Sequence, residues 1–191
     1  GHIKSTYEIK LETGKEFILQ KINKFVFKKP EQVMHNISLC TDFIRKKLIK
    51  NKIKPDRKVL EIVQTKDYQN YFVDENQDYW RVFKFISNAK SYSECSDPKL
   101  FEKVGFAFGQ FQQQLSDFDA SQLFETIPNF HNTPKRLKDF QVALKQDDLL
   151  RSKDCKQEIE FIETTIHYCS YITDRLNDGR LPLRVTHNDT Q

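Results

Sequence analysis

The sequence is poor in residues that interrupt regular structure, and it lacks any long apolar run. Its 191 residues include only 5 glycines and 6 prolines, which excludes a collagen-like or linker-like chain. No apolar run approaches the roughly 20 residues that a membrane-spanning helix needs, and no charged-then-apolar signal segment opens the chain. We therefore expect a globular, cytoplasmic protein that does not contact a membrane.

Cysteines are few and scattered along the chain. They are Cys40, Cys95, Cys155 and Cys169, and no two of them form a Cys-x-x-Cys pair. This spacing argues against a thiolate metal site and against a redox dithiol. We expect reduced, buried thiols.

Basic residues exceed acidic ones by a small margin. There are 31 Lys and Arg against 27 Asp and Glu, which gives a net charge of +4 at pH 7, and the two signs are interspersed. Such a mild excess suits phosphate ligands and is weak evidence for nucleic acid, so we expect no nucleic-acid partner. With 38% hydrophobic residues, the chain can bury a core as one domain or as two small lobes.

The first half of the chain is predicted to be rich in strands. Residues 1–23 alternate between apolar and polar side chains around a turn at Glu12–Lys15, which predicts a β-hairpin. Pro30 suits the first turn of a helix that keeps one apolar face to about Asn51. Strands are then expected at Val59–Thr65, Tyr71–Val73 and Tyr79–Ile86.

The second half is predicted to be helical. One helix begins at Pro98, and its apolar stripe through Leu115 is expected to be core. Ser116–Asp119 looks like the metal-binding loop of a kinase, but in a kinase that loop follows the catalytic loop, so we interpret it as a helix-terminating turn. Further helices are expected from Pro134 to Leu144 and, as one long helix, from Ile159 to Leu176.

The residues near the end of the sequence include a candidate catalytic carboxylate. A β-prone run, Leu183–Thr186, leads into His187, Asn188 and Asp189. A strand that ends in His-x-Asp is how a kinase-type catalytic loop begins, because the strand fixes the direction of the carboxylate and the loop leaves it open to substrate. Asp189 is therefore a candidate catalytic base.

Two features near the N-terminus fit phosphate binding, and each has an ordinary alternative. Lys21 ends an apolar strand as a phosphate-holding lysine does, but it also fits a solvated strand lysine. Gly1 would let the backbone approach phosphates, but it also fits the start of a terminal strand. Glu31 and His35 could face Lys21 from the predicted helix, and we assign neither as its partner.

The most aromatic stretch of the chain, Tyr79–Ile86, is a candidate for the hinge between two lobes. Backbone N–H and C=O groups at its end could bind an adenine edge whatever the side chains are. Ser87–Ser91 follows directly and has the composition of a linker. The alternative is an ordinary core strand.

The order of hairpin, helix, strands, hinge, helices and His-Asn-Asp-Thr is that of a bilobal kinase. With the local wording of its segments, such as FILQKIN, YWRVFKFI and LRVTHNDT, the chain resembles the aminoglycoside phosphotransferase/choline kinase superfamily from end to end. Within that superfamily it is most similar to the N-acetylhexosamine 1-kinase branch. The segments that carry the resemblance are Gly1–Ile3 with Ser5–Tyr7, Phe17–Asn23, Tyr79–Ile86, Ser116–Ala120, Phe130–Pro134 and Leu183–Thr190.

The resemblance implies an α+β, protein-kinase-like fold with two lobes. A small, β-rich nucleotide-binding lobe would cover residues 1–87, with the hinge at its end, and residues 88–191 would form the first part of a helical lobe that this chain leaves incomplete. Asp189 is implied to be the catalytic base, with His187 structural in the same loop. The residues implied to bind ATP are Gly1, His2 and Ile3 in a phosphate-covering loop, Lys21 at the phosphates, and Lys84, Phe85 and Ile86 at the hinge.

The function implied by the resemblance is transfer of the ATP γ-phosphoryl group, with Mg²⁺ as cofactor, to a hydroxyl of a small molecule. The first expectation for the acceptor is the anomeric hydroxyl of an N-acetylhexosamine. Two alternatives stay open. One is a kinase for another small alcohol, such as choline, homoserine or an aminoglycoside, and the other is a non-catalytic, nucleotide-binding pseudokinase.

The sequence departs from the family pattern at its end. Gln191 stands where this branch usually has lysine, and the asparagine and aspartate that would hold magnesium are not reached. We therefore expect the metal ligands beyond Gln191 and a fragment of a longer kinase rather than a degenerate copy. On this interpretation residues 1–191 alone would be inactive.

Overall fold

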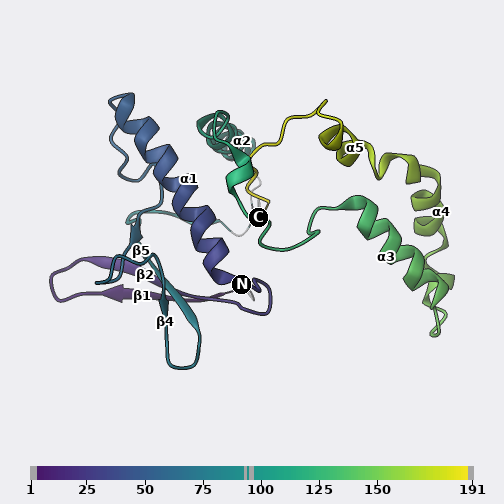
Figure 1. Cartoon of the computed structure of the whole chain (residues 1–191), viewed down its shortest axis with the longest axis horizontal. Coiled ribbons are helices and arrows are strands. Elements are labelled where there is room, and N and C mark those ends of the chain that lie inside the picture. Colours follow the sequence, from purple (N-terminus) through teal and green to yellow (C-terminus); the bar gives the residue numbers. More distant parts are fainter. Residues whose placement is uncertain (1–3, 93, 95–96, 189–191) are drawn as a thin grey trace. The chain divides into compact units, whose positions relative to one another are not determined.

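The computed structural model describes residues 4–92, 94 and 97–188 (Figure 1). The chain forms two compact units: Gly1–Ile127 together with Arg184–Gln191, called unit 1, and Pro128–Leu183, called unit 2. Unit 1 combines a β-sheet with helices, and unit 2 is helical, so the protein is α+β. The units divide at other positions than the two lobes predicted at residues 1–87 and 88–191.

Unit 1 contains a five-stranded antiparallel sheet in which β5 is central, because it pairs with β2, β3 and β4. β1 and β2 form the predicted hairpin. Gly14 closes its turn at a left-handed φ of +78°, and its N–H donates to the Leu11 carbonyl at 2.9 Å. The strands are β1 Lys4–Lys10, β2 Glu16–Ile22, β3 Ile62–Val63, β4 Phe72–Val73 and β5 Tyr79–Lys84.

α1 (Pro30–Lys50) follows the hairpin and begins at the predicted proline. Its buried residues recur at helical spacing and are Pro30, Val33, Met34, Ile44 and Leu48. The helix therefore buries one apolar face along most of its length, as predicted. Across the described residues, neither α1 nor any other helix combines the length and the apolar content needed to cross a membrane.

The two faces of the sheet carry different side chains. Opposed residues of an antiparallel pair point to the same face, and successive residues alternate. β2 and β5 pair Gln20 with Arg81 and Lys21 with Trp80. Arg81 is buried, with Nη1 3.8 Å from Sδ of Met34 in α1. Gln20 and Arg81 therefore face α1, whereas Lys21 and Trp80 lie on the opposite face.

The main core of unit 1 lies beside the second half of α1. Its buried residues are Ile44, Leu48, Leu115 and Phe118. The ring of Phe43 packs edge-on against Phe118, with centroids 5.2 Å apart and an interplanar angle of 85°. Val185, which follows unit 2 in the sequence, packs against the same cluster. The core thus joins α1, the residues after α2 and the returning C-terminal segment.

α2 (Pro98–Gln114) meets this core at its C-terminal end. Phe111, in its last turn, packs against the cluster. Phe101 is 61% exposed, and Val104 is exposed as well. The prediction that the whole stripe is core is therefore wrong for the first turns of α2, because no described part of unit 1 covers them.

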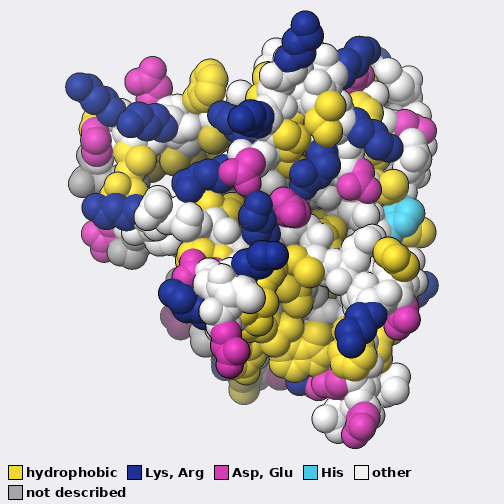
Figure 2. Space-filling view, turned by 90° about the vertical axis from the view of Figure 1, so that its left-hand side faces the viewer, with side chains coloured by type: hydrophobic (Ala, Val, Ile, Leu, Met, Phe, Trp, Pro, Cys, Tyr) yellow, Lys and Arg dark blue, Asp and Glu magenta, His cyan; other side chains and the backbone are white. Residues whose placement is uncertain are grey.

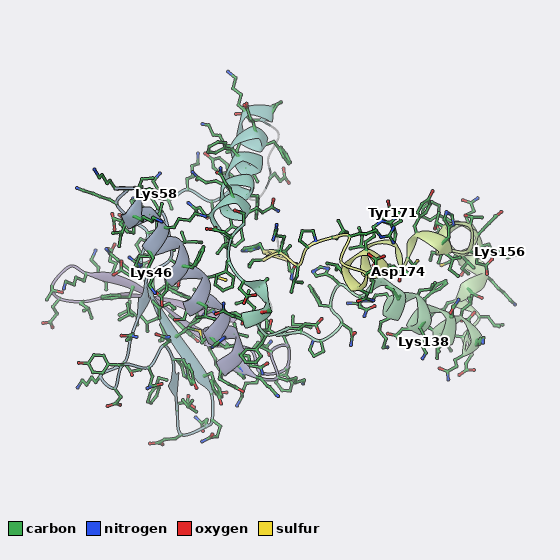
Figure 3. All side chains as sticks on the ribbon, turned by 45° about the horizontal axis from the view of Figure 1, so that its top comes forward. Lys46, Lys58, Lys138, Lys156, Tyr171 and Asp174 are labelled. Atoms are coloured by element: carbon green, nitrogen blue, oxygen red, sulfur yellow. The ribbon has the colours of Figure 1, made fainter. Side chains whose placement is uncertain are left out.

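Unit 2 consists of short helices, and the structure describes all of its residues. They are α3 Thr133–Lys145, η2 Arg151–Asp154, α4 Lys156–Thr165, η3 Ile166–Tyr168 and α5 Tyr171–Asn177. Figure 3 locates Lys138 on α3, Lys156 at the start of α4, and Tyr171 and Asp174 on α5. None of the side chains of unit 2 is buried. Unit 2 therefore has no solvent-excluding core of its own.

The prediction of a single long helix from Ile159 to Leu176 is wrong, because α4 and α5 are separate. The hydroxyls of Thr164 and Thr165 both donate to the carbonyl of Phe161, at 3.0 and 2.6 Å. Such side-chain bonds compete with the helical ladder, and a β-branched run is a poor helix former. The helix therefore ends at these threonines.

The prediction of a strand at Leu183–Thr186 is also wrong, since these residues have no regular secondary structure. A strand needs a neighbour to bond its backbone N–H and C=O groups, and no described segment pairs with this one. Pro182, just before it, has no N–H to offer. Val185 attaches the segment to the core by side-chain packing instead.

The described cysteines, Cys40, Cys155 and Cys169, are free thiols. Cys155 is exposed, and the other two are half-buried. The expectation of buried thiols is therefore wrong for Cys155, which precedes α4 in unit 2, where no side chain is buried. Burial raises the pKa of the Cys40 thiol, so Cys40 stays protonated at neutral pH.

Phe118→Ala should destabilise unit 1 by about 3–4 kcal/mol, because it removes a buried ring and leaves a cavity in the core. Asp119→Ala removes a surface carboxylate that accepts from the N–H and the hydroxyl of Ser121, and it should cost much less stability than the loss of a buried ring. Urea unfolding followed by circular dichroism compares the two variants. Equal losses would contradict the structural role given to Phe118.

Candidate functional site

The predicted site residues fall into two groups. Gly1, His2, Ile3 and Asp189 lie outside the described residues. Lys21, the hinge residues Lys84–Ile86, and His187 are described.

Lys21 lies near the end of β2, on the sheet face opposite α1. Its ammonium group forms an ion pair with Asp78, and it lies 5.8 Å from the centroid of the Trp80 ring. Lys24 reaches the same carboxylate, with Nζ 3.1 Å from Oδ1 of Asp78. Asp78, rather than Glu31 or His35 from α1, is therefore the partner of Lys21.

The turn between β4 and β5 fixes the position of Asp78. Oδ1 of Asp74 accepts the N–H groups of Asn76 and Asp78, at 3.0 and 2.8 Å. Oδ2 of Asp74 accepts the indole N–H of Trp80 at 2.8 Å. Because one carboxylate binds three donors from the turn and from β5, the turn is braced independently of Lys21 and Lys24.

These interactions keep the cluster charged at neutral pH. The hydrogen bond to Asp78 raises the pKa of Lys21, and the same bond lowers the pKa of Asp78. The hydrogen bond from Trp80 lowers the pKa of Asp74. The cluster of Lys21, Lys24, Asp74 and Asp78 therefore carries two positive and two negative charges.

Arg81 is a buried cation that the sequence analysis did not select. It is 5% exposed, its Nε donates to Oε1 of Gln20 at 3.1 Å, and its guanidinium lies 5.0 Å from the centroid of the Phe83 ring. No carboxylate of the described residues pairs with it. Burial lowers its pKa to about 10. The sequence does hold a signal for its burial. Arg81 lies two residues before Phe83 on β5, so the two side chains share the face toward α1.

The backbone of the predicted hinge is partly engaged by the sheet. The N–H of Lys84 donates to the Glu61 carbonyl at 3.0 Å, and that of Phe85 to the Glu16 carbonyl at 3.1 Å. β5 ends at Lys84, earlier than the predicted Ile86. Among the three hinge residues, the N–H of Ile86 is therefore the donor that the described sheet leaves for a ligand.

The side chains around the hinge form a second charged group. Nζ of Lys84 lies 3.2 Å from Oδ1 of Asp56 and 3.7 Å from Oε2 of Glu61. Nη1 of Arg57 donates to the carbonyl of Ser87 at 2.6 Å. These contacts tie the segment after β5 to the loop before β3.

His187 packs on α2. Its ring lies edge-on to Phe108 and Phe111, with centroids 5.8 and 6.0 Å away. Asn188 has a left-handed φ of 61°, and its Oδ1 accepts the Thr186 hydroxyl at 2.6 Å. Aromatic contacts and a local side-chain bond therefore hold this loop, which stands just before Asp189.

The Asp117–Asp119 segment is a helix-terminating turn, as predicted. Asp117 pairs with Lys47 of α1, and Nζ of Lys47 also donates to the Gln114 carbonyl at 3.1 Å. Asp119 accepts the Ser121 N–H at 3.1 Å. Both carboxylates hold local structure.

The described residues do not provide a magnesium site. Within the described ranges, no group of three His, Cys, Asp or Glu side chains is placed to hold a metal ion. No protein-family model matches the sequence. The function is therefore inferred from the positions of Lys21, the hinge residues and the loop that contains His187.

Acidification should release Trp80 from the turn only below the ordinary Asp value of 3.8, because the pKa of Asp74 is lowered. Stability from such a carboxylate is present above its unfolded pKa and is lost as the pH falls through its folded pKa. Trp80 is the only tryptophan, so its fluorescence reports this step. Asp74→Asn should change the emission already at pH 7, whereas Asp56→Asn should not; identical spectra for wild type and Asp74→Asn would exclude the bracing role.

Proposed function

We propose that the protein is an ATP-dependent phosphotransferase that acts on a hydroxyl of a small molecule, with the anomeric hydroxyl of an N-acetylhexosamine as the first candidate acceptor. The observation that carries the proposal is the return of the chain to unit 1. After unit 2, Val185 packs against the core that α1 forms with Leu115 and Phe118. The loop that contains His187 therefore belongs to the same compact unit as Lys21.

The order of elements in unit 1 also supports the proposal. A β-hairpin, a helix after its second strand, and a later central strand that pairs with β2 occur in the order that the kinase resemblance implies. The neighbouring strands β2 and β5 carry Lys21 and the start of the hinge, respectively. A nucleotide that spans these two strands would meet both a cation and a free N–H.

The proposed mechanism assigns one task to each group. Asp189 would orient the acceptor hydroxyl and take its proton as the oxygen attacks the γ-phosphorus, while the bond from that phosphorus to the β–γ bridging oxygen breaks. Lys21 would hold phosphate oxygens, and Ile86 would donate its N–H to the adenine edge. Because the anomeric hydroxyl is more acidic than an alkyl alcohol, positioning by Asp189 matters more than its basicity.

In a longer protein that supplies the expected magnesium ligands, Asp189→Asn should lower turnover by about a hundredfold or more and leave ATP affinity within about threefold, because a general base acts in the transition state and not in nucleotide binding. The measurement is ADP release with an N-acetylhexosamine as acceptor, alongside calorimetric titration with ATP. His131→Asn, in an exposed loop of unit 2, serves as the control. Near-wild-type turnover of Asp189→Asn would refute the assignment.

Lys21→Ala should weaken ATP binding more than acceptor binding, because its charge is directed at phosphates. We expect a loss of about tenfold for ATP and less than twofold for the sugar, the range of one charge-assisted contact. Separate calorimetric titrations give both values, and Lys10→Ala, which removes an exposed lysine from β1, is the control. Equal losses for the two ligands would instead indicate damage to the sheet.

A further inference from the structure

Two lysines share one carboxylate on the sheet face opposite α1. Lys21 binds Oδ2 of Asp78, and Lys24 binds Oδ1 at 3.1 Å. The Asp78 side chain is only 17% exposed, whereas that of Lys21 is 37% exposed. Asp78 is therefore enclosed between two ammonium groups that remain open to solvent on their other sides.

A phosphate group presents the same kind of partner with more charge. It carries up to two negative charges and three acceptor oxygens, and an ammonium group has three donors and no acceptor. Two ammonium groups that already converge on a pair of carboxylate oxygens are therefore spaced to converge on a pair of phosphate oxygens. Asp78 weakens the binding of such a ligand in two ways. It occupies N–H donors of the two ammonium groups, and its negative charge repels the incoming anion.

The position of Asp78 does not depend on the lysines. Asp74 accepts the N–H of Asp78 at 2.8 Å and the Trp80 indole at 2.8 Å, so the turn holds its shape without the ion pairs. Lys24 also donates to the carbonyl of Gln77, in the same turn, at 2.6 Å. Displacement of the carboxylate thus requires rotation of one side chain and leaves the turn in place.

We propose that Asp78 is an internal counter-anion that blocks the Lys21–Lys24 pair, and that a polyphosphate chain binds this pair by displacing the Asp78 carboxylate. The proposal rests on the proposed function only for the identity of the natural ligand, a nucleoside triphosphate. The ion pairs themselves require no nucleotide. Asp78 therefore sets the concentration of polyphosphate at which Lys21 becomes available.

The test uses tripolyphosphate, which has no base or sugar and so does not need a nucleotide site. Asp78→Asn keeps the size of the side chain and removes its charge, and it should tighten tripolyphosphate binding by about threefold to fivefold, the upper part of the range that exposed ion pairs allow. Calorimetric titration at low salt measures the affinity. Unchanged or weaker binding by a folded Asp78→Asn would overturn the proposal.

A matched control separates the specific effect from net charge. Asp56→Asn makes the same change of charge in the loop before β3, where Oδ1 of Asp56 lies 3.2 Å from Nζ of Lys84 in an exposed pair. It should leave tripolyphosphate affinity within about twofold, because Asp78 still occupies Lys21 and Lys24 in this variant. The double variant Lys21→Ala with Asp78→Asn should lose the gain. An equal gain for Asp56→Asn, or a gain that survives the loss of Lys21, would overturn the proposal.

A second measurement does not depend on any variant that could misfold. In the unmodified protein, tripolyphosphate should shift the NMR signals of the Lys21 and Lys24 side chains at lower concentration than those of the other lysines. Earlier shifts at other lysines would overturn the proposal. Trp80 fluorescence checks that the turn remains formed during the titration.

ATP in place of tripolyphosphate distinguishes this proposal from the proposed function. Tighter binding of both ligands by Asp78→Asn supports the two together. Tighter binding of tripolyphosphate with ATP affinity unchanged supports the counter-anion and refutes Lys21 as the phosphate residue of the nucleotide site. The two proposals therefore fail in different arms of the same experiment.

Discussion

The burial of one face of α1 is the constraint on which unit 1 depends. Met34, in the first half of the helix, contacts Arg81 of the central strand, while Ile44 and Leu48 in the second half join the core with Leu115 and Phe118. The same helix thus attaches the sheet at one end and the α2 region at the other.

The two cations Lys21 and Arg81 of unit 1 have different surroundings. Lys21 keeps its charge at the surface with a carboxylate beside it, whereas Arg81 is buried among Gln20, Met34 and Phe83. A buried guanidinium without an acid costs stability and leaves its pKa lowered. Elsewhere the exposed surface mixes hydrophobic patches with Lys and Arg, as Figure 2 shows for one face.

Local sequence patterns predicted the hairpin and α1 of unit 1. The contacts of the candidate site join residues far apart in the sequence, and local patterns do not predict them. Pro30 with the apolar stripe of α1, and Gly14 between two alternating runs, are local signals, and both elements formed as predicted. Asp74–Asp78 lies between two predicted strands, but its contact with Lys21 depends on strand order, which the local sequence does not give. The β-branched residues Thr164 and Thr165 indicated an interruption of the helix. The prediction of one long helix gave more weight to the regular spacing of its apolar residues. Leu183–Thr186 is β-prone, yet a strand also needs a neighbour, and propensity says nothing about that.

The discontinuity of unit 1 has a consequence for the order of events during synthesis. The ribosome completes the sheet, α1, α2 and the whole of unit 2 before Val185 emerges. Until then the core lacks the side chain of Val185. The contacts that complete it join residues far apart in the sequence, and such contacts form slowly. The loop with His187 docks only after unit 2 has been made, so a nascent chain presents the apolar cluster to chaperones until that moment.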